Sequence, residues 1–282
     1  MTIEIKKLHQ KFGAEIINFN LSKDLNNKSF KEILFTFNEY GILLFRKQNL
    51  SIENQVIFGR KFGKVLIHAV NQYHAKGHPE VYVLNNLDDK GNPSGKHPDR
   101  GSLYWHTDGS WRKITGQATI MVADIIPSIG GETQFCCMEN AYASLENSMK
   151  QKIAELSAVH NLDFSRNRRH GHEPLTKEQK NKVPPVTHPI VRTHPITKRK
   201  SLFLGDHAEY IENMNYEKGR EFIETLNKLA INPKFIYTHK YVEGDVLAWD
   251  NRRLLHKGMK YDTAKEKRVS IYRPCSIVNW FA

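Results

Sequence analysis

The sequence predicts a mainly β protein with flanking helices, built on a double-sheet jelly roll. Short strand-like runs lie on both sides of a helical and polar stretch at residues 139–186, an order that two stacked sheets with outer helices satisfy. Strands and helices do not alternate regularly, which argues against a doubly wound parallel sheet. The chain has 282 residues, and β sandwiches and barrels often reach that length as one unit. We therefore expect residues 1–282 to form a single domain, with 139–186 as a helical and loop insertion.

The first third of the chain predicts two helices and two strands. Residues 29–40 place apolar side chains on one helical face and are followed by Gly41, which favours a helix stop. The apolar run 42–45 predicts a buried strand, and residues 81–84 predict another. Ser51 has the side chain of a helix N-cap and is followed by the second helix. The inward positions expected for that helix are Val56, Ile57 and Phe62.

The rest of the chain is predicted from the same signals. Residues 88–100 contain several glycines and prolines among charged residues, which indicates a loop. Because this loop directly precedes a histidine motif, both a lid over a site and a plain surface loop fit it. A helix at 216–231 directs Phe222, Leu226 and Leu229 inward. The other predicted elements are helices within 140–156 and strands at 118–126, 201–204, 235–241, 245–249 and 268–275.

The composition argues against several classes of protein. Since the chain has no apolar run of about 18 residues, we expect no membrane span. The first residues lack a signal-peptide pattern, and the three cysteines form neither a disulfide framework nor a zinc motif. We therefore expect a cytoplasmic protein with free thiols. The net charge of +12 is spread along the chain, so no nucleic-acid partner is expected, although it can attract anionic small molecules.

Two segments far apart in the chain carry the residue types of a metal site. His106 and Asp108 are separated by one residue, and His256 lies far downstream. Two histidines and a carboxylate are the parts of a facial triad for non-haem Fe(II), which leaves one side of the ion open for a co-substrate and O2. On a strand, His106 and Asp108 would point to the same face. A single histidine is more often a structural residue, but the combination favours the metal site.

Two further residues are candidates for binding a carboxylate beside that metal. Arg268 lies at the start of a predicted strand and can grip the distal carboxylate of a dicarboxylic acid through a bidentate charged pair. Thr133 follows a Gly-Gly turn and can add a hydroxyl donor. Taken singly, Arg268 also fits a surface ion pair and Thr133 an ordinary turn residue.

These motifs carry a resemblance that covers nearly the whole chain. The sequence resembles the taurine dioxygenase and 2,4-dichlorophenoxyacetate dioxygenase family of Fe(II)/2-oxoglutarate enzymes. The order and spacing of many segments make the resemblance specific. The segments are 12–16, 43–46, 62–63, 105–111, 130–135, 141–142, 188–195, 235–239, 244–251 and His256.

The resemblance implies a double-stranded β-helix, or cupin-like, core and an oxidative activity. It implies that His106, Asp108 and His256 hold Fe(II), and that Thr133 and Arg268 bind 2-oxoglutarate. The expected reaction uses O2 to hydroxylate or oxidatively cleave a small organic molecule, while 2-oxoglutarate becomes succinate and CO2. The iron carries out the oxidation chemistry, and the protein supplies the geometry of the ligands and the orientation of the substrate.

One position departs from the family pattern. A second arginine is usual four residues after the first, but here Tyr272 stands there and the next arginine is Arg273. Either a bulge in the strand brings Arg273 inward to the co-substrate, or the enzyme does not use it. This departure puts an anionic substrate in doubt. The candidate substrate contacts, which lie in variable regions of the family or at the departure, are His68, Tyr73, Ser102 and Tyr272.

Two alternatives remain open from the sequence. The same scaffold can perform desaturation or another oxidative step in small-metabolite biosynthesis. A non-catalytic basic binding protein is the second alternative, in which the triad is a coincidence. If the protein is an enzyme of either kind, hydroxylating or desaturating, its partner is a small-molecule substrate. A dimer or tetramer of identical chains is compatible with the sequence.

Overall fold

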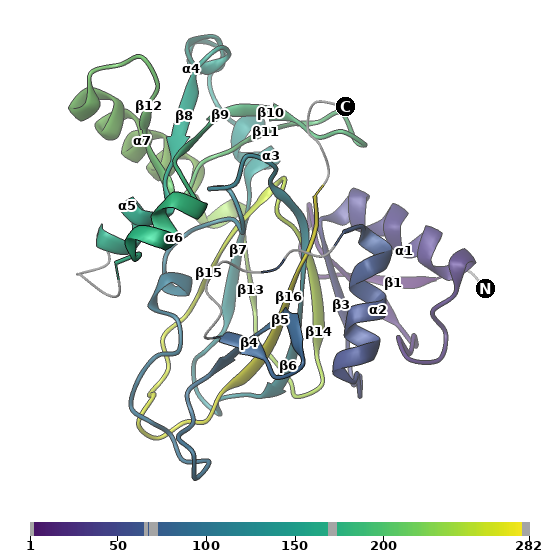
Figure 1. Ribbon diagram of the computed structural model, residues 1–282. Helices are drawn as coiled ribbons and strands as arrows, with labels where there is room; N and C mark the ends of the chain where they lie inside the picture. Colours follow the sequence, from purple (N-terminus) through teal and green to yellow (C-terminus); the bar gives the residue numbers. More distant parts are fainter. Residues whose placement is uncertain (1–2, 65–66, 68–72, 169–173, 278–282) are drawn as a thin grey trace.

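The protein is mainly β with several helices, as a computed structural model shows (Figure 1). The structure describes residues 3–64, 67, 73–168 and 174–277, and for residues 272–277 it describes the backbone alone. Helices α1 and α2 lie beside the large sheet, whereas α7 and a small sheet lie at the opposite side of the molecule (Figure 1). None of the helices in these described ranges has the length and apolar character that crossing a membrane requires.

The large sheet has eight strands in the order β1-β2-β3-β14-β6-β16-β5-β4. Its pairs are antiparallel except for the parallel pair of β2 and β3. The strands are β1 (Glu4–Lys7), β2 (Ala14–Ile17), β3 (Ile42–Phe45), β4 (His74–Ala75), β5 (His78–Asn85), β6 (Gly116–Ile125), β14 (Val246–Asp250) and β16 (Val269–Ile277). Strands β3 and β14 are buried on both faces, which explains their uninterrupted apolar sequences.

A second sheet covers the inner face of the large one. It has the order β13-β7-β15, formed by Ile236–His239, Thr133–Cys137 and Leu254–Gly258. Because side chains alternate along a strand, Leu247 and Trp249 of β14 enter a core shared with Phe135 of β7. The intervening Val246 and Ala248 face α1 and α2 instead. The strand prediction missed β7 and β15, the two strands that pair to carry this inner core.

Two helices close the outer face of the large sheet. Helix α1 (Asn27–Tyr40) begins with a capping box made by Asn26 and Ser29, and it ends at Gly41 with φ of 75°, as expected for a left-handed cap. Helix α2 (Ile52–Phe62) begins at the predicted Ser51 cap. The prediction that Ile57 faces inward is wrong, since 52% of it is exposed and Phe58 takes the buried place.

The expected insertion at residues 139–186 contains helices and a strand that contribute to a hydrophobic core separate from the two beside the large sheet. It includes α3 (Met138–Ala143), α4 (Asn147–Ile153), β8 (Ser157–His160), α5 (Leu162–Arg168) and α6 (Lys177–Lys182). Strand β8 pairs with β9 (Val186–Pro189) and β12 (Ala208–Ile211), and β10 (Val191–Thr193) pairs with β11 (Lys200–Leu202). Helix α7 (Tyr216–Ala230) packs on β12 through Ile223 and Leu226. Its Leu229 is 48% exposed rather than inward, because it lies off that face.

Candidate active site

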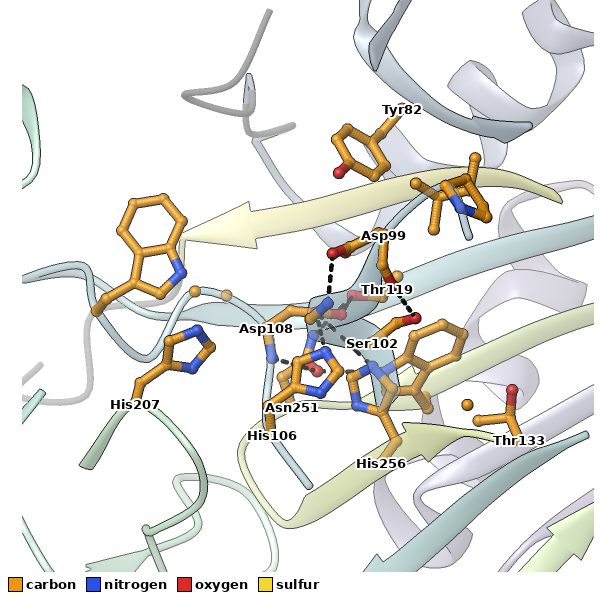
Figure 2. Close-up of a pocket in the computed structure, with 18 of the residues that line it drawn as sticks. Tyr82, Asp99, Ser102, His106, Asp108, Thr119, Thr133, His207, Asn251 and His256 are labelled. Carbon is orange, nitrogen blue, oxygen red and sulfur yellow. Dashed lines mark hydrogen bonds and ion pairs between the residues drawn. The ribbon is translucent and has the colours of Figure 1, made fainter. Parts of the chain in front are cut away.

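His106, Asp108 and His256 converge at one point between the large sheet and the second sheet (Figure 2). One ligand atom of each residue lies within 4.8 Å of the others. His106 and His256 form an isolated antiparallel bridge and exchange two backbone hydrogen bonds, with N···O distances of 3.0 and 2.7 Å. Asp108 Oδ1 lies 3.6 Å from Nε2 of His106 and 3.7 Å from Nε2 of His256.

The local geometry of the His-x-Asp pair differs from the prediction. We expected both residues on one face of a strand, but only His106 takes part in a bridge and Asp108 lies in a turn. Thr107 points away from the pair and donates its hydroxyl to the backbone carbonyl of Asn251 at 2.7 Å. The expected arrangement, with Thr107 pointing away from the pair, is therefore present, although Asp108 lies in a turn and not on a strand.

The surroundings of both imidazoles suit metal binding. The Nδ1 of His106 lies 2.7 Å from the carbonyl oxygen of Tyr104, so Nδ1 carries the proton and Nε2 presents its lone pair toward Asp108. Burial lowers the pKa of His256 well below its ordinary value, and the neighbouring His106 lowers it further. Two imidazole nitrogens and one carboxylate fit the donor set that non-haem Fe(II) prefers.

Asn251 connects the metal-ligand set to the end of β14. Its side-chain oxygen lies 3.2 Å from Nε1 of Trp249 and 3.3 Å from the backbone nitrogen of Asp108. The neighbouring Asp250 is fully buried and binds Arg252 and His194. These contacts make residues 249–251 and His194 part of the scaffold around the candidate ligands.

Arg268 and Thr133 lie on the same side of the cavity, where other groups fix each of them. The Nε of Arg268 donates to Ser270 at 3.2 Å, and its Nη1 donates to the Gly131 carbonyl. The ring of Tyr241 lies 5.6 Å from the guanidinium carbon, and its hydroxyl donates to Thr133 at 2.8 Å. Since a guanidinium has five N–H donors, these contacts leave Nη2 and one Nη1 proton for a carboxylate.

The cavity extends to both sides of the three candidate ligands. Figure 2 shows Thr133 on one side of them and His207 on the other. On the His207 side, Nδ1 of His207 lies 3.2 Å from Ser110, and the adjacent Trp111 packs against Leu162 of α5. Residues that line the cavity include Tyr82, Leu84, His97, Asp99, Ser102, Trp111, Arg112, Ala118, Leu162, Arg166, His207 and Met259.

The sequence matches a known family over almost its entire length. The family described as "Taurine catabolism dioxygenase TauD, TfdA family" matches residues 4–273. The chain belongs to this family. It is an Fe(II)- and 2-oxoglutarate-dependent dioxygenase, a class whose donor set matches the one seen here.

Relatives of this dioxygenase share both its sequence and its fold. It is 31% identical to the alpha-ketoglutarate-dependent 2,4-dichlorophenoxyacetate dioxygenase of Cupriavidus pinatubonensis, over 95% of this chain and 96% of the relative. It is 28% identical to the (S)-phenoxypropionate/alpha-ketoglutarate-dioxygenase of Sphingobium herbicidovorans, over 94% and 92%. The crystal structure of AAD-2 in complex with Mn(II) and N-oxalylglycine superposes with a TM-score of 0.84, at 30% identity and 99% of each chain. A taurine dioxygenase structure from Burkholderia xenovorans gives 0.79 at 26%, covering 97% and 89%.

The other predicted contacts of the dioxygenase have mixed outcomes. Ser102 lines the cavity. Tyr73 is not among the described residues that line it, and its ring lies 4.9 Å from that of Tyr82, which does. His68 lies outside the described residues, as do the side chains of Tyr272 and Arg273.

The backbone of β16 bears on the question of a bulge at Arg273. The register shift against β6 lies between Val269 and Ser270, and its extra residue is Asp124 of β6. Strand β16 itself pairs with β5 without interruption from Val269 to Tyr272. The described pairing of β16 therefore contains no extra residue of the kind expected for a bulge that turns Arg273 inward.

Sequence reasoning missed several residues of the cavity. Thr119, His207, Arg112 and Arg166 all line it, yet none belongs to a recognisable local motif. For Thr119 a signal did exist, since it lies two residues before Met121 on a strand and so shares its inward face.

Proposed function

We propose that this dioxygenase holds Fe(II) with His106, Asp108 and His256, and binds 2-oxoglutarate with Arg268 and Thr133. The observation that carries the proposal is the meeting of three ligand atoms within 4.8 Å, from residues up to 150 positions apart in the chain. Arg268 is preferred to Arg273 because Arg268 already lies in the cavity wall with donors to spare.

The protein residues then have separate tasks. Bound iron supplies the O2-dependent oxidation of a C–H bond, coupled to conversion of 2-oxoglutarate to succinate and CO2. The Tyr104 carbonyl keeps the proton of His106 on Nδ1, so that Nε2 remains a donor to the metal. Arg268 and Thr133 fix the far carboxylate of the co-substrate, which orients its keto acid end toward the ligand set.

On the His207 side we propose a small organic substrate with an apolar body and an anionic group. Trp111 and Leu162, which pack together, offer apolar surface, and Arg112 and Arg166 bring positive charge to the same cavity. The guanidinium carbon of Arg112 lies 4.6 Å from the Trp111 ring, so stacking holds it in place. Phenoxyacetate-type compounds, named for two of the relatives, have this combination of groups. Arg112 and Arg166 thus offer positive charge in a protein that has Tyr272 where the family usually has a second arginine.

Four further expectations are part of the proposal. The two facing sheets form a double-stranded β-helix, which is supported by the core that they share. Residues 1–282 act as one domain. The enzyme works in the cytoplasm, consistent with the buried free thiols of Cys136 and Cys137. It acts without nucleic acid or membrane partners, and a dimer or tetramer is compatible with it.

Succinate release tests the proposal. Purified protein receives Fe(II), ascorbate and 2-oxoglutarate with phenoxyacetate, and in parallel with the neutral analogue phenoxyethanol. We expect succinate release to be stimulated by the anion and much less by the alcohol. Product analysis then separates the outcomes. Hydroxylation of phenoxyacetate at the carbon beside the ether oxygen gives a hemiacetal that breaks into phenol and glyoxylate. Desaturation needs C–H bonds on two adjacent carbons, so it is tested with 2-phenoxypropionate, where it would appear as the loss of two hydrogens. No iron binding and no succinate with any candidate would instead favour a binding protein.

A further inference from the structure

Thr119 contacts the candidate metal ligand Asp108 without being a candidate ligand itself. It lies on the inward face of β6, opposite Trp249 of β14 in the sheet register, and only 2% of it is exposed. Its hydroxyl donates to Oδ2 of Asp108 at 2.5 Å (Figure 2). A short hydrogen bond to an ionised oxygen is among the stronger ones in proteins.

The direction of this hydrogen bond is fixed by Asn251. The side-chain oxygen of Asn251 faces two N–H donors, Nε1 of Trp249 and the backbone nitrogen of Asp108. Its amide nitrogen must therefore be the atom that lies 2.9 Å from the Thr119 hydroxyl, and it donates to that oxygen. Because Thr119 has a single proton, that proton goes to the carboxylate, which is an acceptor only.

The two oxygens of Asp108 consequently have different environments. Oδ2 accepts the proton of Thr119, whereas Oδ1 faces the Nε2 atoms of His106 and His256 at 3.6 and 3.7 Å. The side chain of Asp108 is partly exposed and lies in a turn. The hydroxyl of Thr119 is the described side-chain contact that selects which oxygen faces the histidines.

We propose that Thr119 is a positioning residue that makes Asp108 a one-oxygen ligand of the metal. Trp249, Asn251 and Thr119 form a directional chain of donors that ends on Oδ2 and leaves Oδ1 for the ion. The inference rests on the assignment of Asp108 as a ligand in the proposed function. Hydrogen-bond partners of metal ligands typically contribute about 10–100-fold to metal affinity.

The experiment measures Mn(II) affinity of the metal-free protein by the electron paramagnetic resonance signal of free Mn(II). Thr119→Val keeps the shape of the side chain and removes the hydroxyl, and Thr119→Ser keeps the hydroxyl. We expect Thr119→Val to weaken Mn(II) binding about 10–100-fold and Thr119→Ser to bind as the wild type does. Thermal unfolding of the metal-free proteins shows whether each variant is folded. If Thr119→Val does not fold, Thr119→Ala takes its place as the variant without the hydroxyl and is compared with Thr119→Ser.

Asp108→Ala separates the ligand set from the role of Thr119. If Asp108→Ala binds Mn(II) normally, the proposed ligand set is wrong. If Asp108→Ala loses binding while Thr119→Val keeps wild-type affinity, the ligand set stands and the role of Thr119 is refuted. Equal loss of affinity in Thr119→Ser and Thr119→Val would also refute it, because the hydroxyl would then not be the determining group.

Discussion

The carbonyl oxygen of Gly131 accepts a hydrogen bond from Nη1 of Arg268, and a Cβ atom at Gly131 would lie 2.8 Å from that same nitrogen. A side chain at this position would therefore push the guanidinium out of its place. Gly131 also has φ of +73°, a conformation that favours glycine. The Gly-Gly turn thus has a direct part in placing the proposed co-substrate arginine.

Replacement of Gly131 by alanine should raise the KM for 2-oxoglutarate by about tenfold, corresponding to about 1.4 kcal/mol of lost binding. Steady-state succinate release at varied 2-oxoglutarate measures this. Gly91→Ala is the matched control, since Gly91 has φ of +78° and a Cβ atom there would meet nothing within 4 Å. It carries the backbone strain without the collision, so its KM should not change. If the KM for 2-oxoglutarate rose in both variants, backbone strain and not a collision with Arg268 would explain the effect.

Arg268→Ala should raise the 2-oxoglutarate requirement further, by about 100-fold, because it removes a charged bidentate partner worth about 3 kcal/mol. Saturating co-substrate should restore part of the rate. The adjacent and exposed Lys267 provides the control in Lys267→Ala, which should behave as the wild type. An unaltered requirement in Arg268→Ala would transfer the role to Arg273.

Arg166→Gln should weaken the anionic substrate and leave 2-oxoglutarate binding unchanged. Arg166 lines the cavity from α5, one helical turn from Leu162, so both residues belong to the same wall. We expect the KM for phenoxyacetate to rise about tenfold, as for loss of one partly exposed charge contact. Arg168→Gln, on the same helix but outside the cavity, should have no effect. A parallel rise in KM for phenoxyethanol would show that Arg166 contributes packing rather than charge.

The stability of the metal-free protein should fall as the pH decreases from about 6.5 to about 4. Burial, with help from Arg192, lowers the pKa of His188 to about 4 from 6.5. Burial also lowers the pKa of His160, whose ring nitrogens have no hydrogen-bond partner among the described residues. Both histidines are neutral when folded and take up protons on unfolding, so acid favours the unfolded state. Each contributes about 1.4 kcal/mol per pH unit in this window.

Urea unfolding at a series of pH values measures this slope. His160→Phe should reduce this slope by about one proton's contribution, about 1.4 kcal/mol per pH unit, because it removes one titrating group. The variant should still fold, since the new ring can pack on the neighbouring Phe203, whose ring centroid lies 5.2 Å from that of His160. The same slope in His160→Phe and wild type would mean that His160 is protonated in the folded state.

The candidate metal ligands could be named from the sequence because their residue types occur in short motifs. His106 and Asp108 are close in sequence, and His256 completes a rare combination of residue types. Thr119 was not predictable in this way. Its role depends on the pairing of β6 with β14, which brings it next to a residue 132 positions away, and no local pattern encodes that pairing.

The fold was predicted best where strong local signals occur. The caps Ser51 and Gly41 and the apolar strand β3 are where they were expected. The errors at Ile57 and Leu229 are errors of helical phase, since one step around a helix turns a side chain by about 100°. Strand β15 was missed because its five residues include a lysine and the candidate ligand His256, which dilute the strand pattern.

The reciprocal backbone bridge between His106 and His256 implies that the two imidazoles keep their spacing in the absence of any ion. Peptide groups of the main chain set that spacing, and the surrounding core is complete without metal. Treatment with a chelator should therefore abolish turnover while circular dichroism remains unchanged, and added Fe(II) should restore activity within the mixing time. Iron would thus be exchangeable in an already folded protein, which could lose and rebind the ion without refolding.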